Sequence, residues 1–261
     1  MKIPIYQIDA FTNRLFAGNP AAVCVLEKWI SETLMQSIAA ENNLAETAFV
    51  VSKEDFFEIR WFTPEAEVDL CGHATLASAY VLFTHLSVKS DQIRFVTKNS
   101  GELFVRKNGE ELQLDFPQDF LEEILPIPLL EEAFGAKPNA TYKGKTDFLL
   151  VFESQQQIQN IEPNFALIAQ AGMRGVIITA KGDEVDFVSR FFAPQIGVPE
   201  DPVTGSAHTS LTPYWSTILG KQKLTAKQLS KRGGNLVCEM LNDRILISGT
   251  AKSFLVGEID V

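Results

Sequence analysis

The chain has 261 residues, of which 46% are hydrophobic and 21% are charged, as expected of a globular protein. Its 23 Lys and Arg residues against 33 Asp and Glu residues give a formal net charge of −10, which argues against nucleic acid or an anionic membrane surface as a partner. The length suits two domains of about 130 residues each.

The cellular location is suggested by what the sequence lacks. The first residues are interrupted by Pro4, Gln7 and Asp9, so they do not read as a signal peptide, and no apolar run reaches the roughly 20 residues of a membrane span. The cysteines are odd in number, far apart and without zinc-site spacing: Cys24, Cys71 and Cys238. We therefore expect a cytoplasmic protein in a reducing compartment.

Hydrophobic patterns predict strands in the first half at residues 3–10, 21–26, 46–52, 56–62, 93–97, 101–107 and 112–116. Gly18-Asn19-Pro20 has the composition of a turn. Ser31 is a suitable N-cap for a helix through Glu41. A second helix follows Gly72, and because its residues 74–83 are apolar on nearly every face, we expect it to be buried on all sides.

Three prolines mark residues 117–128 as a candidate linker between a first domain, 1–117, and a second domain, 129–251, with residues 252–261 as a candidate final part of the first. The second half is predicted to contain helices at 129–134 and 164–171, a helix after Gly205 that carries Pro213, and strands at 146–152, 175–180, 186–192, 224–230, 236–241, 244–248 and 254–261.

Two stretches, 62–83 and 192–220, follow the same plan. Each begins with Phe-x-Pro and passes through an acidic loop to a small glycine motif that opens an apolar run, Cys71-Gly72-His73-Ala74 in the first and Thr204-Gly205-Ser206-Ala207 in the second. The repetition predicts an α+β protein of two related halves whose matched helix starts face one another across a cleft.

The two glycine motifs predict a binding site for an anion. The first four N–H groups of a helix have no partner within it, and the peptide dipoles add partial positive charge at the same end. Gly72 and Gly205 would let backbone approach a ligand. We therefore expect a substrate carboxylate to be bound at Gly72, Ala74, Thr204 and Gly205. The alternative is a pair of core helices with tight glycine entries.

Glu46 and His73 are the candidates for proton transfer. Glu46 begins an apolar strand, where partial desolvation would make its carboxylate a better base near neutral pH. His73 lies at a helix start, where positive potential favours a neutral imidazole. The alternatives are an exposed glutamate at a strand end and a ring that hydrogen-bonds local backbone.

Asp201, Ser206 and Cys71 are further candidates. Asp201 precedes the second glycine motif and could cap the helix or orient a catalytic partner. Ser206 is a natural capping residue, and as a nucleophile it lacks the second glycine of a G-x-S-x-G elbow. Cys71 at its helix entry is a candidate low-pKa thiolate. Its counterpart in the second half is Thr204, so a mechanism with two thiols has only one available.

Several of these segments carry a family resemblance. Residues 11–23 with Gly18-Asn19-Pro20, residues 43–47, residues 69–75 and residues 198–207 resemble motifs of the PhzF family of phenazine-biosynthesis-like isomerases, as do Gln228, Ser230 and residues 232–234. That family is related in fold to diaminopimelate epimerase. The resemblance covers nearly the whole chain, and its motifs occur in the family's order.

The resemblance implies two pseudo-symmetric diaminopimelate epimerase-like domains, each a β-barrel-like sheet wrapped round a central helix, with the active site in the cleft between them. It also implies proton transfer without a cofactor. The family's catalytic residues map onto Glu46, His73, Asp201 and Ser206. Racemases of the wider fold family use one cysteine from each half, and the presence of Thr204 opposite Cys71 argues against that chemistry here.

We therefore expect an isomerase that moves a proton on a small carboxylate substrate, with neither a metal nor a nucleotide. The sequence has no P-loop, no G-x-G-x-x-G after a strand and no clustered His and Cys ligands. Two alternatives remain: a non-catalytic small-anion-binding protein on the same fold, and a Cys71-dependent racemase or epimerase. An exposed strand edge could mediate a homodimer, and the sequence leaves monomer and dimer open.

Overall fold

The computed structural model describes residues 1–261, which form two compact units. Unit 1 comprises residues 1–115 and 248–261, and unit 2 comprises residues 116–247. The segment 117–128, predicted as a linker, belongs to unit 2. There β9 (Glu122–Ile124) pairs antiparallel with β10 (Ala140–Lys143), so this segment is part of the second fold and not a free connection.

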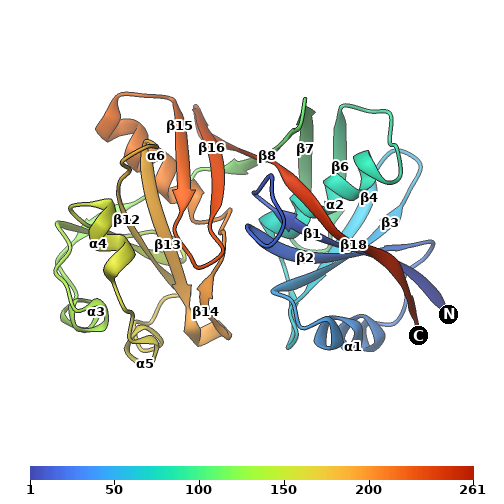
Figure 1. Ribbon diagram of the computed structural model, residues 1–261, viewed down its shortest axis with the longest axis horizontal. Helices are drawn as coiled ribbons and strands as arrows, with labels where there is room; N and C mark the ends of the chain where they lie inside the picture. Colours follow the sequence, from blue (N-terminus) through green and yellow to red (C-terminus); the bar gives the residue numbers. More distant parts are fainter. The chain divides into compact units, whose positions relative to one another are not determined.

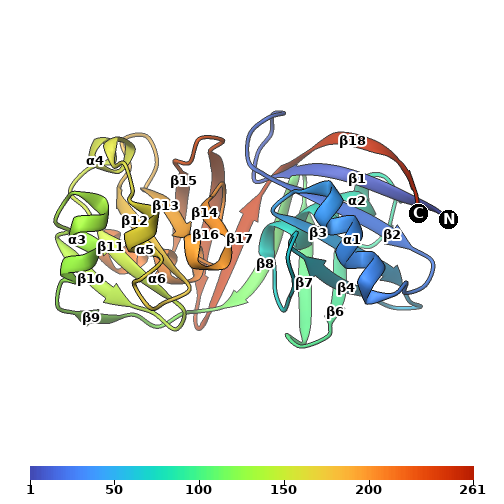
Figure 2. The ribbon, with the colours of Figure 1, turned by 90° about the horizontal axis from the view of Figure 1, so that it is seen from below.

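Unit 1 is a strongly curved sheet with one internal helix (Figures 1 and 2). Its strands are β1 (Lys2–Ala10), β2 (Asn19–Leu26), β3 (Glu46–Ser52), β4 (Phe57–Phe62), β5 (Glu67–Val68), β6 (Gln92–Thr97), β7 (Glu102–Asn108), β8 (Glu111–Pro117) and β18 (Ala251–Asp260). β1 is antiparallel to both β2 and β18, so the last strand of the chain returns to the first sheet. β2 and β3 pair in parallel, as do β4 and β6.

Helix α2 (Gly72–Thr84) is the internal helix of unit 1, and the strands surround it in Figure 1. Ten of its residues are buried, which agrees with the expectation from its apolar faces: His73, Ala74, Thr75, Leu76, Ala77, Ser78, Ala79, Val81, Leu82 and Phe83. Helix α1 (Glu32–Asn42) covers the outside of the sheet. The Ser31 hydroxyl caps α1 by accepting from the Leu34 amide, as predicted.

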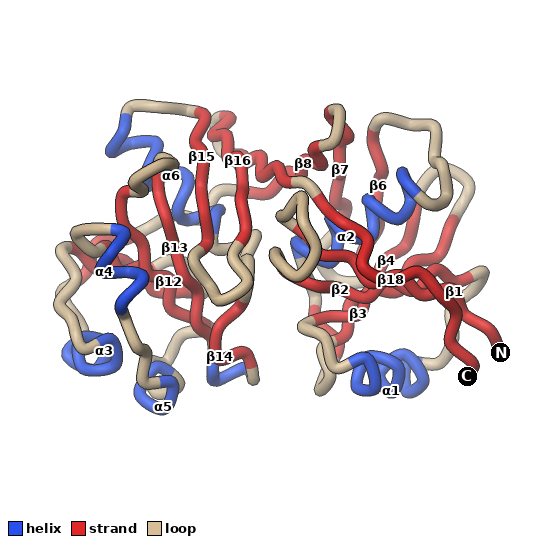
Figure 3. The backbone as a smooth tube through the Cα atoms, in the orientation of Figure 1, coloured by secondary structure: helices blue, strands red, loops and turns tan.

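Unit 2 contains more and shorter elements. Its other strands are β11 (Asp147–Val151), β12 (Gly175–Lys181), β13 (Phe187–Ala193), β14 (Val198–Asp201), β15 (Lys223–Gln228), β16 (Gly234–Leu241) and β17 (Arg244–Gly249), the last of which runs on into unit 1. Its helices are α3 (Pro128–Phe134), α4 (Gln155–Asn160), α5 (Phe165–Ile168) and α6 (His208–Leu219), with a short 3-10 turn, η1 (Pro194–Ile196). The tube in Figure 3 shows strands outweighing helices in both units.

The strand pairings of the two units match in order and direction. In unit 1 the series is β2 parallel to β3, β3 antiparallel to β4, and β4 antiparallel to β5 and parallel to β6. In unit 2 it is β11 parallel to β12, β12 antiparallel to β13, and β13 antiparallel to β14 and parallel to β15. α2 and α6 occupy the same place in the two series, so the repeated sequence plan corresponds to a repeated topology.

The structure differs from the sequence-based expectation at several local points. α6 begins at His208, later than the glycine motif, and Pro213 lies inside it. The helix predicted at 164–171 is only the four-residue α5, capped by the Asn164 side chain. β5, β10, β14 and α4 were not predicted, because elements of two to six residues give too short a pattern to recognise. None of the helices is both long enough and apolar enough to span a membrane.

Candidate active site

In unit 1 the start of β3 and the start of α2 bring Glu46 and His73 together. Glu46 is the first residue of β3 and lies opposite Ala21 of β2, while His73 is the second residue of α2. Glu46 Oε2 lies 3.1 Å from His73 Nε2, and only 17% and 6% of the two side chains are exposed. The contact is off the line of a straight hydrogen bond, and no other group bonds to this nitrogen. Catalytic hydrogen bonds are often poorly aligned before substrate binds.

The other ring nitrogen of His73 has two neighbours. Asn19 Nδ2 lies 3.2 Å from His73 Nδ1, and Cys71 Sγ lies 3.5 Å from the same atom. Asn19 is fully buried at the start of β2. Gly18 places it there with a positive φ of 65°, where a Cβ would lie 2.1 Å from the Ala10 carbonyl oxygen, so the turn requires glycine.

The protonation of this cluster differs from the sequence-based expectation. Burial on its own lowers the pKa of His73, but Cys71 and Glu46 outweigh burial, and the net pKa lies well above the ordinary value. The prediction of a neutral imidazole was therefore wrong. Burial also raises the pKa of the Cys71 thiol, so the predicted low-pKa thiolate is not found. Cys71 and Glu46 lie against the two ring nitrogens of His73, and both favour the protonated ring.

The first turn of α2 adds positive potential beside this pair. Cys71 is the N-cap, and its side chain makes no capping hydrogen bond. The amides of Gly72 and His73 have no acceptor within the helix, and they lie at the positive end of its dipole. An anion could therefore bind to backbone at this end of α2, next to Glu46.

The same cluster contains side chains of the types that bind metal ions. One ligand atom each from Glu46, Cys71 and His73 lies within 4.8 Å of the others. The carboxylate, however, faces Nε2 and the sulfur faces Nδ1, which are opposite sides of the imidazole. A ring nitrogen binds a metal ion along its own lone pair, so in this arrangement the three side chains do not surround a single ion.

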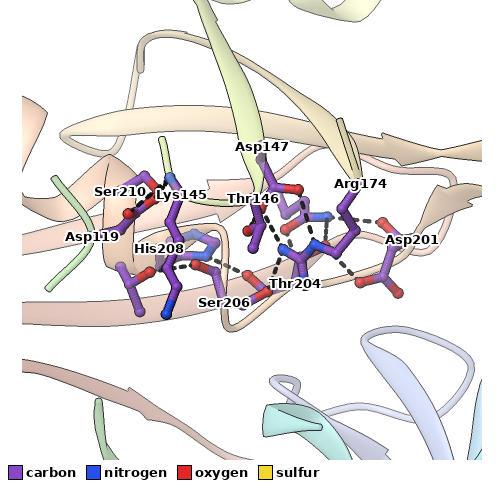
Figure 4. A network of polar contacts seen from close by, with 12 residues as sticks. Asp119, Lys145, Thr146, Asp147, Arg174, Asp201, Thr204, Ser206, His208 and Ser210 are labelled. Carbon is purple, nitrogen blue, oxygen red and sulfur yellow. Dashed lines mark hydrogen bonds and ion pairs between the residues drawn. The ribbon is translucent and has the colours of Figure 1, made fainter. Parts of the chain in front are cut away.

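In unit 2 the equivalent region contains an ion pair and a hydroxyl (Figure 4). Arg174 lies just before β12, and its Nε donates to Asp147 Oδ1 at 2.9 Å while its Nη2 donates to Asp147 Oδ2. Nη2 also donates to Ser206 Oγ at 3.1 Å. Asp147 is buried, and it accepts a further bond from the hydroxyl of Thr146 at 2.9 Å. Ser206 is thus held by a cation, and it is not the cap of α6.

Asp201 and Thr204 form a second polar group in unit 2. Thr204 Oγ1 donates to Asp201 Oδ2 at 2.6 Å. Gln228 accepts from the Thr204 amide at 2.9 Å and donates to the Asp201 carbonyl at 2.8 Å, which ties the loop to β15. The Asp201 carboxylate therefore accepts from the side-chain hydroxyl of the glycine motif that follows it.

His208 opens α6 and is fully buried. Its Nδ1 lies 2.8 Å from the Thr204 carbonyl oxygen and donates to it, and its ring lies 5.9 Å from that of Phe187. Burial lowers the pKa of His208 to about 4, so this ring is neutral at ordinary pH. It bonds to backbone and not to Ser206, so no Ser–His pair is formed.

The family of this chain follows from comparison with known proteins. The family model described as phenazine biosynthesis-like protein matches residues 8–257. The chain belongs to the PhzF family. A Pseudomonas aeruginosa protein named as an uncharacterised isomerase is 47% identical over 259 residues, and the match covers 99% of both chains. The crystal structure of a PhzF-family protein from Enterococcus faecalis, 48% identical, superposes with a TM-score of 0.98 over 100% of both chains.

More distant structures show the fold. A hydroxyproline epimerase from Agrobacterium vitis shares 8% identity but superposes with a TM-score of 0.64, covering 99% of this chain and 92% of that one. The epimerase-like fold predicted from the resemblance is therefore confirmed for this PhzF-family chain.

Each unit brings together its own share of the predicted site residues: Glu46, Gly72, His73 and Ala74 in unit 1, and Asp201, Thr204, Gly205 and Ser206 in unit 2. Sequence reasoning assigned no role to Asn19, Asp147 or Arg174. Asn19 was visible only as a turn residue. Asp147 is the second residue of the predicted strand 146–152, and Arg174 directly precedes the predicted strand 175–180. Charged residues at the starts of two neighbouring parallel strands were the signal that could have identified them.

Proposed function

We propose that this protein is an isomerase that moves a proton between carbon atoms of a small carboxylate substrate, using its own side chains. The observation that carries the proposal is the Glu46–His73 pair at the positive end of α2. A largely buried carboxylate beside backbone N–H groups combines a base with a site for the negative charge that deprotonation creates.

In this mechanism Glu46 removes a proton from a carbon next to a carbonyl or double bond. The amides of Gly72 and His73 stabilise the negative charge that develops on the substrate. The His73 ring stabilises the Glu46 carboxylate electrostatically and keeps it oriented. Glu46 then returns the proton to another carbon. The reaction transfers no electrons and no group, so its chemistry requires neither a redox cofactor nor a metal.

The residues of unit 2 are assigned to substrate binding, on the basis of the family motifs that they match. Ser206 and the Gly205 backbone would contact a polar group of the substrate, and Asp201 with Thr204 would orient it. Arg174 joins this set because it donates directly to Ser206. Replacement of these residues is expected to raise KM more than it lowers kcat. The cytoplasmic location and the homodimer remain predictions, the latter testable by light scattering.

The test is hydrogen exchange from solvent. Wild-type protein is incubated in heavy water with a mixture of small carboxylates that carry an acidic C–H, and deuterium gain is measured by mass spectrometry. We expect gain in one or a few compounds, and a decrease of about 10²- to 10⁴-fold in Glu46→Gln, because that variant lacks the base.

The matched control is Glu58→Gln, which removes a part-buried carboxylate of β4 that accepts from Trp29 Nε1 and lies outside the cluster. It is expected to exchange at the wild-type rate. Full exchange by Glu46→Gln would show that another group is the base.

The alternatives predict different outcomes. A non-catalytic anion-binding protein would bind a carboxylate without any gain of deuterium. A Cys71-dependent racemase would be inactivated by thiol reagents, but the buried Cys71 has a raised pKa and faces no second cysteine, since Thr204 occupies the matching motif position. The proton-transfer isomerase is the function that the geometry supports best.

A further inference from the structure

Asn19 belongs to the Gly18-Asn19-Pro20 motif, but it has no part in the proposed mechanism. Asn19 is fully buried, and its amide nitrogen lies 3.2 Å from His73 Nδ1. An NH₂ group only donates hydrogen bonds, so the nitrogen that it faces has to accept. On the opposite side of the ring, Nε2 faces the Glu46 carboxylate, which only accepts. Asn19 therefore favours an unprotonated Nδ1, and Glu46 favours a protonated Nε2.

We propose that Asn19 is a positioning residue that decides which nitrogen of His73 gives up its proton. When the imidazolium loses one proton, the proton on Nε2 is stabilised by Glu46, while a proton on Nδ1 would point at the Asn19 amide. Nδ1 is therefore the atom that deprotonates, and Nε2–H faces Glu46 in both charge states of the ring.

The remaining groups around the ring agree with this assignment. The charged or titratable groups that face His73 are Glu46 and Cys71. Cys71 Sγ lies 3.5 Å from Nδ1 and is a weak acceptor, so it can receive Nδ1–H when the ring is charged. The thiol and the amide thus share one side of the ring, and the carboxylate occupies the other.

This arrangement has a consequence for the reaction, and it rests on the proposed function. A His73 ring that always carries Nε2–H cannot take a proton from Glu46 through that nitrogen. The proton taken from substrate therefore stays on Glu46 until it is returned, and His73 keeps an N–H group facing the carboxylate throughout. Asn19 contributes by making Nδ1, and not Nε2, the ring nitrogen that loses its proton.

Nitrogen NMR of the imidazole rings tests the assignment without any substrate. The chain has only three histidines, so His73→Gln and His85→Gln identify the signals of the ¹⁵N-labelled protein. We expect Nδ1 of His73 to change to an unprotonated shift as the pH is raised while Nε2 keeps its proton. A titration in which Nε2 loses the proton would overturn the proposal.

Asn19→Asp gives the second test, because it replaces the amide donor by an acceptor of the same shape. A carboxylate beside Nδ1 favours the doubly protonated ring, so the midpoint of the His73 titration should move up by about 1 to 3 pH units. Gln113→Glu is the matched control: it makes the same amide-to-acid change in unit 1, at a side chain that donates to Ser248 Oγ at 3.1 Å. It should leave the His73 midpoint unchanged.

If Asn19→Asp does not fold, Asn19→Ala can be used to test the role of Asn19. It removes the donor without adding charge, so the share of the neutral ring that carries its proton on Nδ1 should rise, although Glu46 still favours Nε2–H. An unchanged single tautomer in Asn19→Ala, or equal midpoints in Asn19→Asp and Gln113→Glu, would overturn the role of Asn19.

The proposed function is tested separately by deuterium gain. In Asn19→Asp the pH profile of exchange should move with the His73 midpoint. If NMR confirms the tautomer while Glu46→Gln exchanges at the wild-type rate, the positioning role of Asn19 survives and the assignment of Glu46 as base fails.

Discussion

The glycine motifs of the two units occupy the same place in matching topologies but carry different chemistry. In unit 1 the motif places His73 against the Glu46 carboxylate, a pair in which both members can change protonation. In unit 2 it places Ser206 against Arg174, whose charge is permanent and is already paired with Asp147. In the proposed function, unit 1 therefore moves the proton, and unit 2 holds a polar group of the substrate.

The strand register shows why unit 2 has no carboxylate at the position that Glu46 occupies in unit 1. Glu46 begins β3 and lies opposite Ala21, and the residue in the same position of unit 2 is Gly175, opposite Asp147. A Cβ on Gly175 would lie 2.4 Å from Phe191 Cζ, so the ring of Phe191 fills the space that a side chain would need. The carboxylate of unit 2 is therefore on the neighbouring strand, where Arg174 neutralises it.

The two buried histidines, one in each unit, have pKa shifts in opposite directions. His73 has a carboxylate beside it, and its pKa is raised, whereas His208 has a carbonyl oxygen and an aromatic ring beside it, and burial lowers its pKa to about 4. The neighbouring charge, and not the depth of burial, decides the direction.

The largest expected effect concerns stability as a function of pH. Unfolded His208 has a pKa near 6.5, so the unfolded state binds more protons than the folded state between pH 6.5 and pH 4. The free energy of unfolding should fall by about 1.4 kcal/mol for each pH unit in this window as the pH is lowered. Urea unfolding between about pH 5 and pH 6.5 measures this slope, and His208→Gln should flatten it.

His73 should act in the opposite direction. Its folded pKa is raised, so its contribution to stability is complete below pH 6.5 and is lost as the pH rises above 6.5 through the folded pKa. His73→Gln should therefore reduce the pH dependence of the free energy of unfolding above pH 6.5 and leave its slope below pH 6.5 unchanged. If His208→Gln instead reduced the pH dependence above pH 6.5, the opposite pKa shifts of the two histidines would be wrong.

A smaller effect is expected from the ion pair of unit 2. Asp147→Asn leaves Arg174 without its partner, but about a third of the Arg174 side chain is exposed, and water offsets part of the loss. We expect a loss of about 2 kcal/mol in the free energy of unfolding, together with a higher KM because Arg174 no longer holds Ser206 in place.

The control for Asp147 is Glu200→Gln, which breaks the Arg190–Glu200 pair of the same unit. It should destabilise the protein by a similar amount and leave KM unchanged. If the two variants had equal KM values, the Asp147–Arg174 pair would contribute to stability and not to substrate binding.

Much of this comparison could be predicted from the sequence, and the limits have physical causes. The repeated Phe-x-Pro and glycine motifs indicated two related halves, and the apolar run after Gly72 indicated a buried helix, because both features are local in the chain. The partners of the site residues could not be predicted, because Asn19 and Arg174 reach His73 and Ser206 only through the tertiary fold. The protonation of His73 failed as a prediction because the helix dipole was considered without the nearby Glu46 charge.

The smallest expected effect is that of Cys71→Ser, and it decides whether the thiol takes part. A two-thiol mechanism would need a cysteine in each glycine motif, but here the second motif carries Thr204, which donates to Asp201, while Cys71 lies beside His73 Nδ1. Serine keeps a polar atom beside Nδ1, so deuterium exchange should change by less than about threefold. Exchange rates of the wild type and Cys71→Ser, each with and without iodoacetamide, provide the measurement. Loss of exchange by a factor comparable to that of Glu46→Gln would make Cys71 a proton carrier and would give unit 1 two acid–base groups where the structure indicates one.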